Sequence, residues 1–284
     1  MNTKMMWKAA ACAAAVLGMA MVAGCGSSDK GASSAAGSAQ AQGKVLQKIK
    51  QSGKIVVGTA SGYPPYEFID TSKGDKTVIG IDMAWAQKLA DKLGVKLEVQ
   101  DMNFQSLLSS LASGKVDIAI AGINPTDERR KTMDFSDNYL PTQQTMVIRK
   151  ADADKYKTLA DFTGKQIGVQ KSTTQEALAK AEIKDAKIVA LTKVPDAILE
   201  LKQGKVDGVV VEGIGGKQYL VYNDDLMFAD VKFQNGTKNS AAALQKGNED
   251  LLKIVNEVIK ENTDNGNFAK WEDEYVKKSV ENAK

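Results

Sequence analysis

The chain has 284 residues, with 38 Lys and Arg against 35 Asp and Glu, two Cys and no His. The absence of His excludes Ser-His-Asp triads, Cys-His dyads and His-ligated metals, and two Cys are too few for a Cys₄ metal or iron–sulfur site. A net charge of +3 argues against a dedicated nucleic-acid binder, which usually carries a concentrated basic face. We therefore expect neither a metal nor a cofactor.

The N-terminal segment is expected to be a targeting signal rather than part of the folded domain. Lys4 and Lys8 precede an uncharged apolar run at 9–23, which is short for a membrane span. The small residues that lead to Cys25 resemble the lipobox of bacterial lipoproteins. This implies a signal peptide over 1–24 and a lipidated Cys25 that carries palmitate; a plain signal peptide with an incidental Cys is the alternative. Residues 26–43 are mostly Gly, Ser and Ala, which predicts a flexible linker.

Short β-branched runs and amphipathic helices alternate through the remaining chain. In chain order we expect strands at 54–59, 95–99, 116–120, 166–170, 187–191 and 206–211, and helices at 80–93, at 104–112, from about 175, and at 196–202, 248–262 and 268–280. This alternation predicts an α/β fold built from parallel βαβ units.

Two segments, 111–122 and 201–212, share a helix end, a Gly-Lys turn, a Val-Asp pair and a buried strand. The repeat indicates two related α/β lobes, although chance similarity between βα turns is the alternative. Open α/β sheets bind ligands beyond the carboxyl ends of their strands, and clefts between domains are favoured sites. The residues just after the strands are therefore the candidates.

Two strand ends in the first half carry candidate residues. Tyr63 lies in a Pro-Pro turn, where it either stacks on a ligand or packs locally. After the strand near 120, Gly122 permits close backbone approach, Asn124 offers a donor and an acceptor, and Arg129 has the fork that suits a carboxylate. A solvated Arg129 is the alternative.

Two strand ends in the second half add further candidates. Thr173 and Thr174 open a helix, whose free N–H groups favour an anion; simple N-capping by either threonine, which does not exclude anion binding, is the alternative. Glu212 closes an apolar strand and suits an ammonium group, with a surface acid as the alternative.

The order and spacing of several motifs resemble the solute-binding proteins of bacterial ABC importers for polar amino acids. These motifs are Tyr63-Pro-Pro-Tyr-Glu-Phe68, Gly80-Ile-Asp82, Leu111-Ala-Ser-Gly-Lys-Val-Asp117, Ala121-Gly122 with Glu128-Arg129, Asp134-Phe-Ser-Asp137, Thr173-Thr174, Gly204-Lys-Val-Asp207 and Trp271. The resemblance implies the two-lobe type 2 periplasmic-binding-protein fold, each lobe an open α/β sheet, with a hinge of two crossover strands. Lobe 1 would comprise 44–141 and 239–284, and lobe 2 would comprise 142–238.

The resemblance also implies roles for seven residues. Arg129 would bind the ligand carboxylate with help from Thr174. Glu212, the Gly122 carbonyl and the Asn124 side chain would bind the α-ammonium. Tyr63 and Phe104 would sandwich the ligand side chain.

Three positions depart from the family pattern. Glu212 replaces the usual Asp, Asn124 stands where Ser or Thr is common, and Ala60 stands where some binders of basic amino acids carry Asp. The last departure weakens a lysine-selective interpretation but leaves arginine, glutamine and histidine open. Gln144, near the first crossover, is a candidate contact for a polar side chain.

The function implied is capture of a polar amino acid and its delivery to an ABC permease and its ATPase. The protein would be a monomer, anchored by the lipid on Cys25 to the extracytoplasmic face of the cell membrane. It would not be an enzyme. A cyclohexadienyl-dehydratase-like enzyme, with Glu212 as general acid, and an amino-acid sensor are the alternatives.

Overall fold

The computed structural model describes residues 43–72 and 74–282, so the predictions for the signal peptide, Cys25 and nearly all of the linker lie outside the described residues. Within these ranges the helices are α2 (Lys44–Ser52), α3 (Ile81–Leu93), α4 (Phe104–Ala112), α5 (Asp127–Arg130), α6 (Thr174–Glu182), α7 (Val194–Lys202), α8 (Gly213–Tyr222), α9 (Glu249–Asp264) and α10 (Asn267–Asn282), with the 3₁₀ helices η1 (Lys150–Asp152) and η2 (Leu159–Phe162). The strands are β1 (Lys54–Thr59), β2 (Phe68–Asp70), β3 (Thr77–Ile79), β4 (Lys96–Asp101), β5 (Ile118–Ile123), β6 (Met133–Phe135), β7 (Leu140–Arg149), β8 (Gln166–Gln170), β9 (Lys187–Leu191), β10 (Gly208–Glu212), β11 (Leu226–Phe228) and β12 (Thr237–Gln245). None of these helices combines the length and the apolarity that a membrane span requires.

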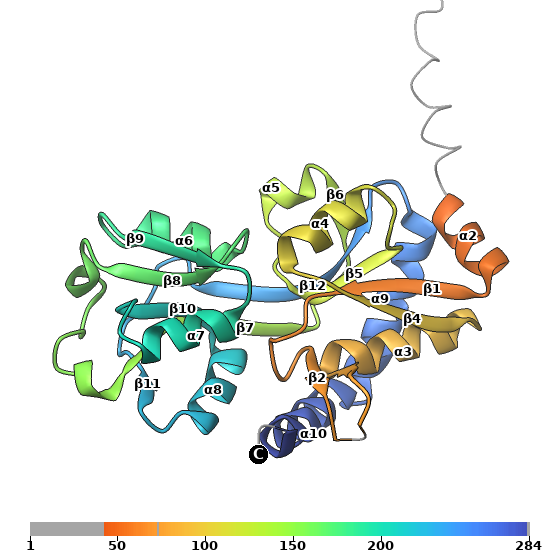
Figure 1. Ribbon diagram of the computed structural model, residues 1–284. Coiled ribbons are helices and arrows are strands. Elements are labelled where there is room, and N and C mark those ends of the chain that lie inside the picture. The colour runs from red at the N-terminus through yellow and green to blue at the C-terminus, as the bar shows by residue number, and fades with distance from the viewer. Residues whose placement is uncertain (1–42, 73, 283–284) are drawn as a thin grey trace, which may run out of the picture.

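Two lobes share two long strands, β7 and β12 (Figure 1). In the first lobe β1 pairs in parallel with β4 and β5; in the second, β8 pairs in parallel with β9 and β10. The strands β7 and β12 pair with each other between the lobes, and they continue as antiparallel neighbours of β10 and β5 respectively. The main strand order is therefore β4-β1-β5-β12-β7-β10-β8-β9. The predicted α/β fold with two lobes is confirmed.

The predicted bounds agree with the structure most closely for strands made of a buried β-branched run and for helices that end at a recognisable cap. Strands β1, β8 and β9 and helix α4 have the predicted bounds, and α3 ends at Gly94 in the left-handed region. Strand β5 starts later than predicted, at Ile118. The preceding Asp117 instead uses its carboxylate to accept from the N–H of Val56, at 2.8 Å, so this stretch joins β1 partly through a side chain.

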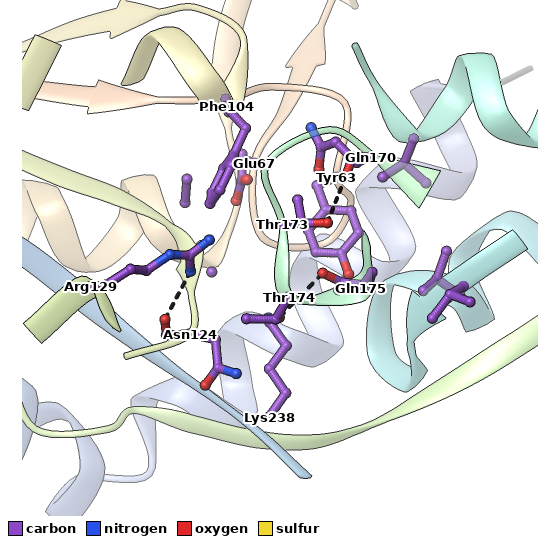
Figure 2. A pocket seen from close by; sticks show the side chains of 16 residues that line it. Tyr63, Glu67, Phe104, Asn124, Arg129, Gln170, Thr173, Thr174, Gln175 and Lys238 are labelled. Atoms are coloured by element: carbon purple, nitrogen blue, oxygen red, sulfur yellow. Dashed lines mark hydrogen bonds between the residues drawn. The ribbon is translucent and has the colours of Figure 1, made fainter. Parts of the chain in front are cut away.

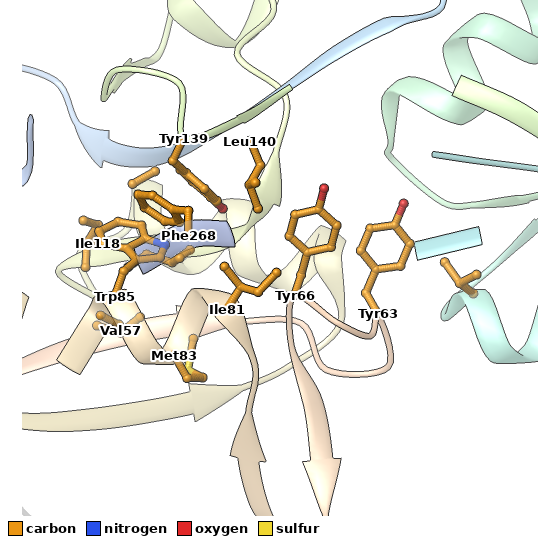
Figure 3. Packing of buried hydrophobic residues seen from close by; sticks show 14 of the residues in the cluster. Val57, Tyr63, Tyr66, Ile81, Met83, Trp85, Ile118, Tyr139, Leu140 and Phe268 are labelled. Carbon is orange, nitrogen blue, oxygen red and sulfur yellow. The ribbon is translucent and has the colours of Figure 1, made fainter. Parts of the chain in front are cut away.

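Aromatic side chains fasten the C-terminal helix to the first lobe. Trp85 of α3 is fully buried and lies 5.4 Å from the ring of Tyr139, which in turn stacks on Phe268 of α10 at 5.5 Å. Figure 3 shows this cluster, together with the rings of Tyr66 and Tyr63 extending from it. Burial of such rings stabilises the lobe and gives the wall of the cleft a rigid base.

The loop that carries Tyr63 is held by the start of α3. The N–H groups of Ile81 and Asp82, which have no partner within the helix, donate to the carbonyls of Pro65 and Tyr66 at 3.0 Å each. Gly80 precedes this contact with φ 137°, and a Cβ built on it would lie 2.0 Å from the Tyr66 carbonyl oxygen. This position therefore requires glycine.

Replacing Gly80 by alanine is expected to lower the free energy of unfolding by more than about 3 kcal/mol, because backbone atoms must move apart at a backbone angle that alanine disfavours. Gly94→Ala is the matched control: φ is 69° there, and nothing lies within 4 Å of the added Cβ. It should cost only about 1 kcal/mol. Urea unfolding of both variants measures the difference, and equal losses would contradict the account of the loop.

Candidate functional site: a cavity between the lobes

A cavity lies between the two lobes, and both lobes contribute to its wall (Figure 2). Its lining residues come from the loop after β1, from the ends of β5 and β8 and the loops that follow them, from the starts of α4, α6 and α7, from α5, from β10 and from β12. They are Ala60, Tyr63, Glu67, Phe104, Ala121, Gly122, Asn124, Arg129, Gln170, Thr173, Thr174, Gln175, Val194, Val210, Val211 and Lys238. Six of the seven predicted ligand contacts are among them. The free space is about 30 Å³, so an amino acid enters only if the lobes or the lining side chains move.

Arg129 reaches across the cleft from the short helix α5. Its Nη1 donates to the Asn124 carbonyl at 2.9 Å, and its Nη2 donates to the Ser172 carbonyl in the second lobe at 3.0 Å. The guanidinium lies over the Phe104 ring, 5.2 Å from its centroid. Burial lowers the pKa of Arg129 to about 10, which leaves it charged at neutral pH. A partly buried guanidinium with N–H groups left over is a binding partner for a carboxylate.

Thr174 begins helix α6 in the second lobe. Thr173 is the N-cap, since its Oγ1 accepts from the N–H of Glu176 at 3.3 Å. The hydroxyl of Thr174 instead accepts from Gln144 Nε2 at 3.4 Å. Gln144 is buried, and its Oε1 has no hydrogen-bond partner among the described residues. The capping interpretation of the threonines thus holds for Thr173 and leaves Thr174 facing the cavity.

Gly122 lies near the end of β5, Asn124 directly follows that strand, and both line the cavity. The N–H of Gly122 donates to Asp82 Oδ2 at 2.7 Å, and the other oxygen of Asp82 accepts from the hydroxyl of Tyr139 at 2.8 Å. The side chain of Asn124 accepts from the N–H of Asn239 at 3.3 Å, which joins this loop to β12. The buried Asp82 therefore fixes the backbone that presents the Gly122 carbonyl.

Glu212 is fully buried and lies outside the cavity lining. Its carboxylate caps helix α8, where it accepts from the N–H of Ile214 at 2.9 Å and also from the N–H of Gly215. The N–H of Glu212 itself donates to the Tyr63 hydroxyl at 3.4 Å. A side-chain oxygen that accepts from the first N–H groups of a helix is the usual N-cap arrangement. Its role toward an ammonium group stays a prediction.

Two charged residues of the lining, Glu67 and Lys238, were not among the predicted contacts. Glu67 is 1% exposed; its carboxyl lies within hydrogen-bonding reach of the Asp82 carboxyl, and its Oε2 accepts no N–H or O–H within the described ranges. Burial and the neighbouring Asp82 raise the pKa of Glu67 well above its ordinary value. The Tyr-Pro-Pro-Tyr-Glu motif contains Glu67, so a sequence signal was available, but a glutamate after a proline turn is usually exposed.

Lys238 has no comparable signal in the sequence. It lies on β12 at the crossover and is 3% exposed. Burial lowers the pKa of Lys238, while the charges of Glu212, Glu67 and Asp82 raise it. Burial also raises the pKa of Asp82, to about 6. Charged side chains of both signs therefore line the cavity or lie directly behind its wall, and buried charges are tolerated only when they are paired or hydrogen-bonded.

Within the described ranges, no group of three or more His, Cys, Asp or Glu side chains is arranged to hold a metal ion. The family model described as "Bacterial extracellular solute-binding proteins, family 3" matches residues 55–278. The arginine-binding extracellular protein ArtP of Bacillus subtilis is 36% identical over 222 residues, which cover 76% of this chain and 84% of ArtP.

Solved structures are similar over the same region. The amino acid ABC transporter substrate-binding protein AbpA of Streptococcus pneumoniae, bound to L-arginine, matches with a TM-score of 0.80 and 33% identity, over 82% of this chain and 99% of that one. An ancestral amino-acid-binding protein, AncCDT-1, described as a precursor of cyclohexadienyl dehydratase, matches with a TM-score of 0.75 and 31% identity, over 82% of this chain and 100% of its own. The relatives are binding proteins, and the dehydratase alternative is no better supported.

Proposed function

Because this chain belongs to the bacterial extracellular solute-binding proteins of family 3 and is an amino-acid-binding component of an ABC transporter, we propose that its cleft binds arginine. The observation that carries the proposal is the buried Glu67 carboxyl, which lines the cavity with an oxygen that has no partner within the described ranges. A guanidinium carries N–H donors in a planar fork and would satisfy that oxygen. ArtP, which is named as an arginine-binding protein, and AbpA, whose structure contains bound L-arginine, are in keeping with this choice.

The α-carboxylate of the ligand would meet Arg129 from the first lobe and Thr174 from the second. Arg129 would keep its two carbonyl contacts and use its remaining N–H groups. The hydroxyl of Thr174 and the free N–H at the start of α6 would add donors from the opposite side. One carboxylate would thereby bridge the two lobes and favour the closed state, since only that state offers both sets of donors.

The α-ammonium would meet acceptors at the floor of the cleft. These are the Gly122 carbonyl and the side-chain oxygen of Asn124, with the Glu212 carboxylate as counter-charge. Each oxygen of Glu212 already accepts one N–H from α8 and retains a further lone pair. Tyr63 and Phe104, which both line the cavity, would enclose the ligand side chain and carry it toward Glu67.

The charges balance for a ligand with one net positive charge. With every group ionised, the cations Arg129 and Lys238 and the acids Glu67, Asp82 and Glu212 sum to one negative charge. Arginine supplies the compensating positive charge. With a neutral amino acid, the sum of charges reaches zero only if Glu67 binds a proton. Buried charges persist only when they are paired, so this balance favours arginine over its neutral analogues.

A thermal-shift screen against the common amino acids tests the ligand. At 100 times its dissociation constant a ligand stabilises the folded chain by about 2.7 kcal/mol. We expect arginine to raise the melting temperature by several degrees, and more than citrulline, its neutral analogue. A larger shift with citrulline or glutamine than with arginine would reject arginine as the ligand.

Delivery to the permease would begin from the membrane surface. The proposed anchor is the lipid on Cys25, exposed after removal of 1–24, with 25–43 as the tether. The protein would work as a monomer with a permease and its ATPase as partners. The hinge would lie where β7 and β12 pair, with 44–141 and 239–284 as one lobe and 142–238 as the other; the pairing of 237–240 with 140–143 supports these limits.

Replacing Cys25 by serine is expected to move the protein from the membrane fraction to the soluble extracytoplasmic fraction, because the acyl chains would have no thiol to attach to. Cys12→Ser is the matched control and should leave the protein at the membrane, since Cys12 departs with the signal peptide. Fractionation followed by immunoblotting measures both. A Cys25→Ser protein that stays at the membrane would reject the lipid anchor.

A further inference from the structure

A lysine lies inside the cavity, where the proposed ligand brings a positive charge of its own. The ammonium of Lys238 lies over the faces of Tyr66 and Tyr63, 5.1 and 5.8 Å from the ring centroids. A Cβ built on Gly122 would lie 3.5 Å from Lys238 Nζ. The ammonium is therefore beside the backbone proposed to bind the ligand α-ammonium, and against the aromatic wall proposed for the ligand side chain.

The partners of this ammonium are few. Its hydrogen bond within the described ranges goes to Ser240 Oγ at 3.4 Å, and no described carboxylate forms an ion pair with it. An ammonium has three donors, so two remain for the cavity. Glu212, Glu67 and Asp82 attract it over longer distances, while Arg129 repels it. The charge of Lys238 thus acts on the cavity as a whole rather than on a single partner.

The position of Lys238 on β12 keeps that charge in the cleft. Its backbone pairs with Thr142 of β7 at the crossover, and the side chain is 3% exposed. A surface lysine withdraws into solvent when a cation arrives, but a lysine buried under two tyrosines has no such route. A cationic ligand therefore meets a fixed positive charge as well as the carboxyl of Glu67.

We infer that Lys238 is a specificity-determining residue, which sets how strongly the cleft prefers a cationic amino acid to a neutral one of the same shape. The inference rests on the proposed function and deepens it. With Lys238 present, the two cations and three acids counted above sum to one negative charge when all are ionised. A ligand side chain with one positive charge brings this sum to zero. Without Lys238 the sum is two negative charges, and the advantage of a cationic side chain grows.

Arginine and citrulline provide the test, because they have nearly the same shape and differ in the charge of the side chain. Both are titrated against full-length protein in mild detergent. The Lys238→Met variant should increase the affinity ratio of arginine to citrulline at least about tenfold over that of the unchanged protein. Lys270→Met is the matched control: it removes one positive charge from an exposed position on α10 and should leave the ratio unchanged.

The ratio separates this inference from a purely structural role. If Lys238 merely supports the fold, Lys238→Met weakens both ligands alike and the ratio stays constant, which would overturn the inference. Both affinities come from the same preparation, so a fraction of unfolded protein affects them equally and leaves their ratio unchanged. Lys238→Gln, which retains a hydrogen-bonding group for Ser240, should shift the ratio in the same direction. If the unchanged protein binds no arginine, the proposed ligand fails, but arginine binding gained by Lys238→Met would still support the inference.

Discussion

Replacing Arg129 by alanine is expected to weaken arginine binding by about 3 kcal/mol or more, which is at least about a hundredfold in Kd. The guanidinium is the partly buried cation that the ligand carboxylate would meet, and its removal would leave that carboxylate in the closed cleft without a charged partner. The same change removes the contact from Arg129 to the Ser172 carbonyl across the cleft, so the closed state also loses a stabilising contact. Isothermal titration calorimetry measures the loss.

The next residue of α5 supplies the control for this experiment. Arg130 is exposed and lies over the Phe135 ring, 5.4 Å from its centroid, outside the cavity lining. Arg130→Ala should change the Kd by less than about twofold. Arg129→Lys keeps a charge but loses the planar fork, so it should bind arginine weakly. Retention of affinity by Arg129→Ala would contradict the carboxylate assignment.

Replacing Glu67 by glutamine is expected to weaken arginine binding by about 2 kcal/mol, or roughly thirtyfold, while citrulline binding changes little. The variant keeps the shape of the side chain and removes the negative charge that would face the guanidinium. Asp127→Asn, at an exposed acid of the same lobe, should leave both affinities nearly unchanged. An equal loss for the two ligands would show that Glu67 does not bind the ligand cation.

The pH dependence of binding gives an independent check on Glu67. Burial, Asp82 and Asp101 raise the pKa of Glu67 in the empty cleft, and Lys238 opposes them. A guanidinium beside the carboxyl favours the ionised form, so the pKa falls on binding and a proton is released. Below the pKa of the empty cleft, arginine affinity should therefore rise with pH. Calorimetry in two buffers of different ionisation enthalpy measures the released proton, and Glu67→Gln should release fewer.

The sequence predicts the fold best where local signals agree with tertiary structure. The buried β-branched strands and the capped helix before Gly94 need no distant partner to be recognised. Helix α8 is not predicted from the sequence, because Gly213, Gly215 and Gly216 have a low helix propensity. The cap from Glu212 and packing in the lobe compensate for that low propensity. The crossover strands β7 and β12 lack a clear period, and only the family resemblance implies them.

The residues of the candidate site also form two groups: those that local sequence signals predict and those that they do not. Arg129, Phe104 and Thr174 follow strands or open helices, so the rule for open α/β sheets places them near a ligand. Glu67 and Lys238 enter the cavity for another reason: the contact between α3 and the Tyr63 loop and the pairing of β12 with β7 bring distant segments together. Glu212, in contrast, turns toward α8 through local contacts, because its carboxylate accepts from the N–H groups of Ile214 and Gly215.

We propose that this cleft closes on a single arginine molecule, and isothermal titration calorimetry of the purified protein with arginine decides the matter. We expect saturable heat with one arginine bound per chain, a Kd in the low micromolar range or tighter, and weaker binding of citrulline. Absence of binding heat with arginine at millimolar concentration, while another amino acid saturates the same preparation, would contradict it.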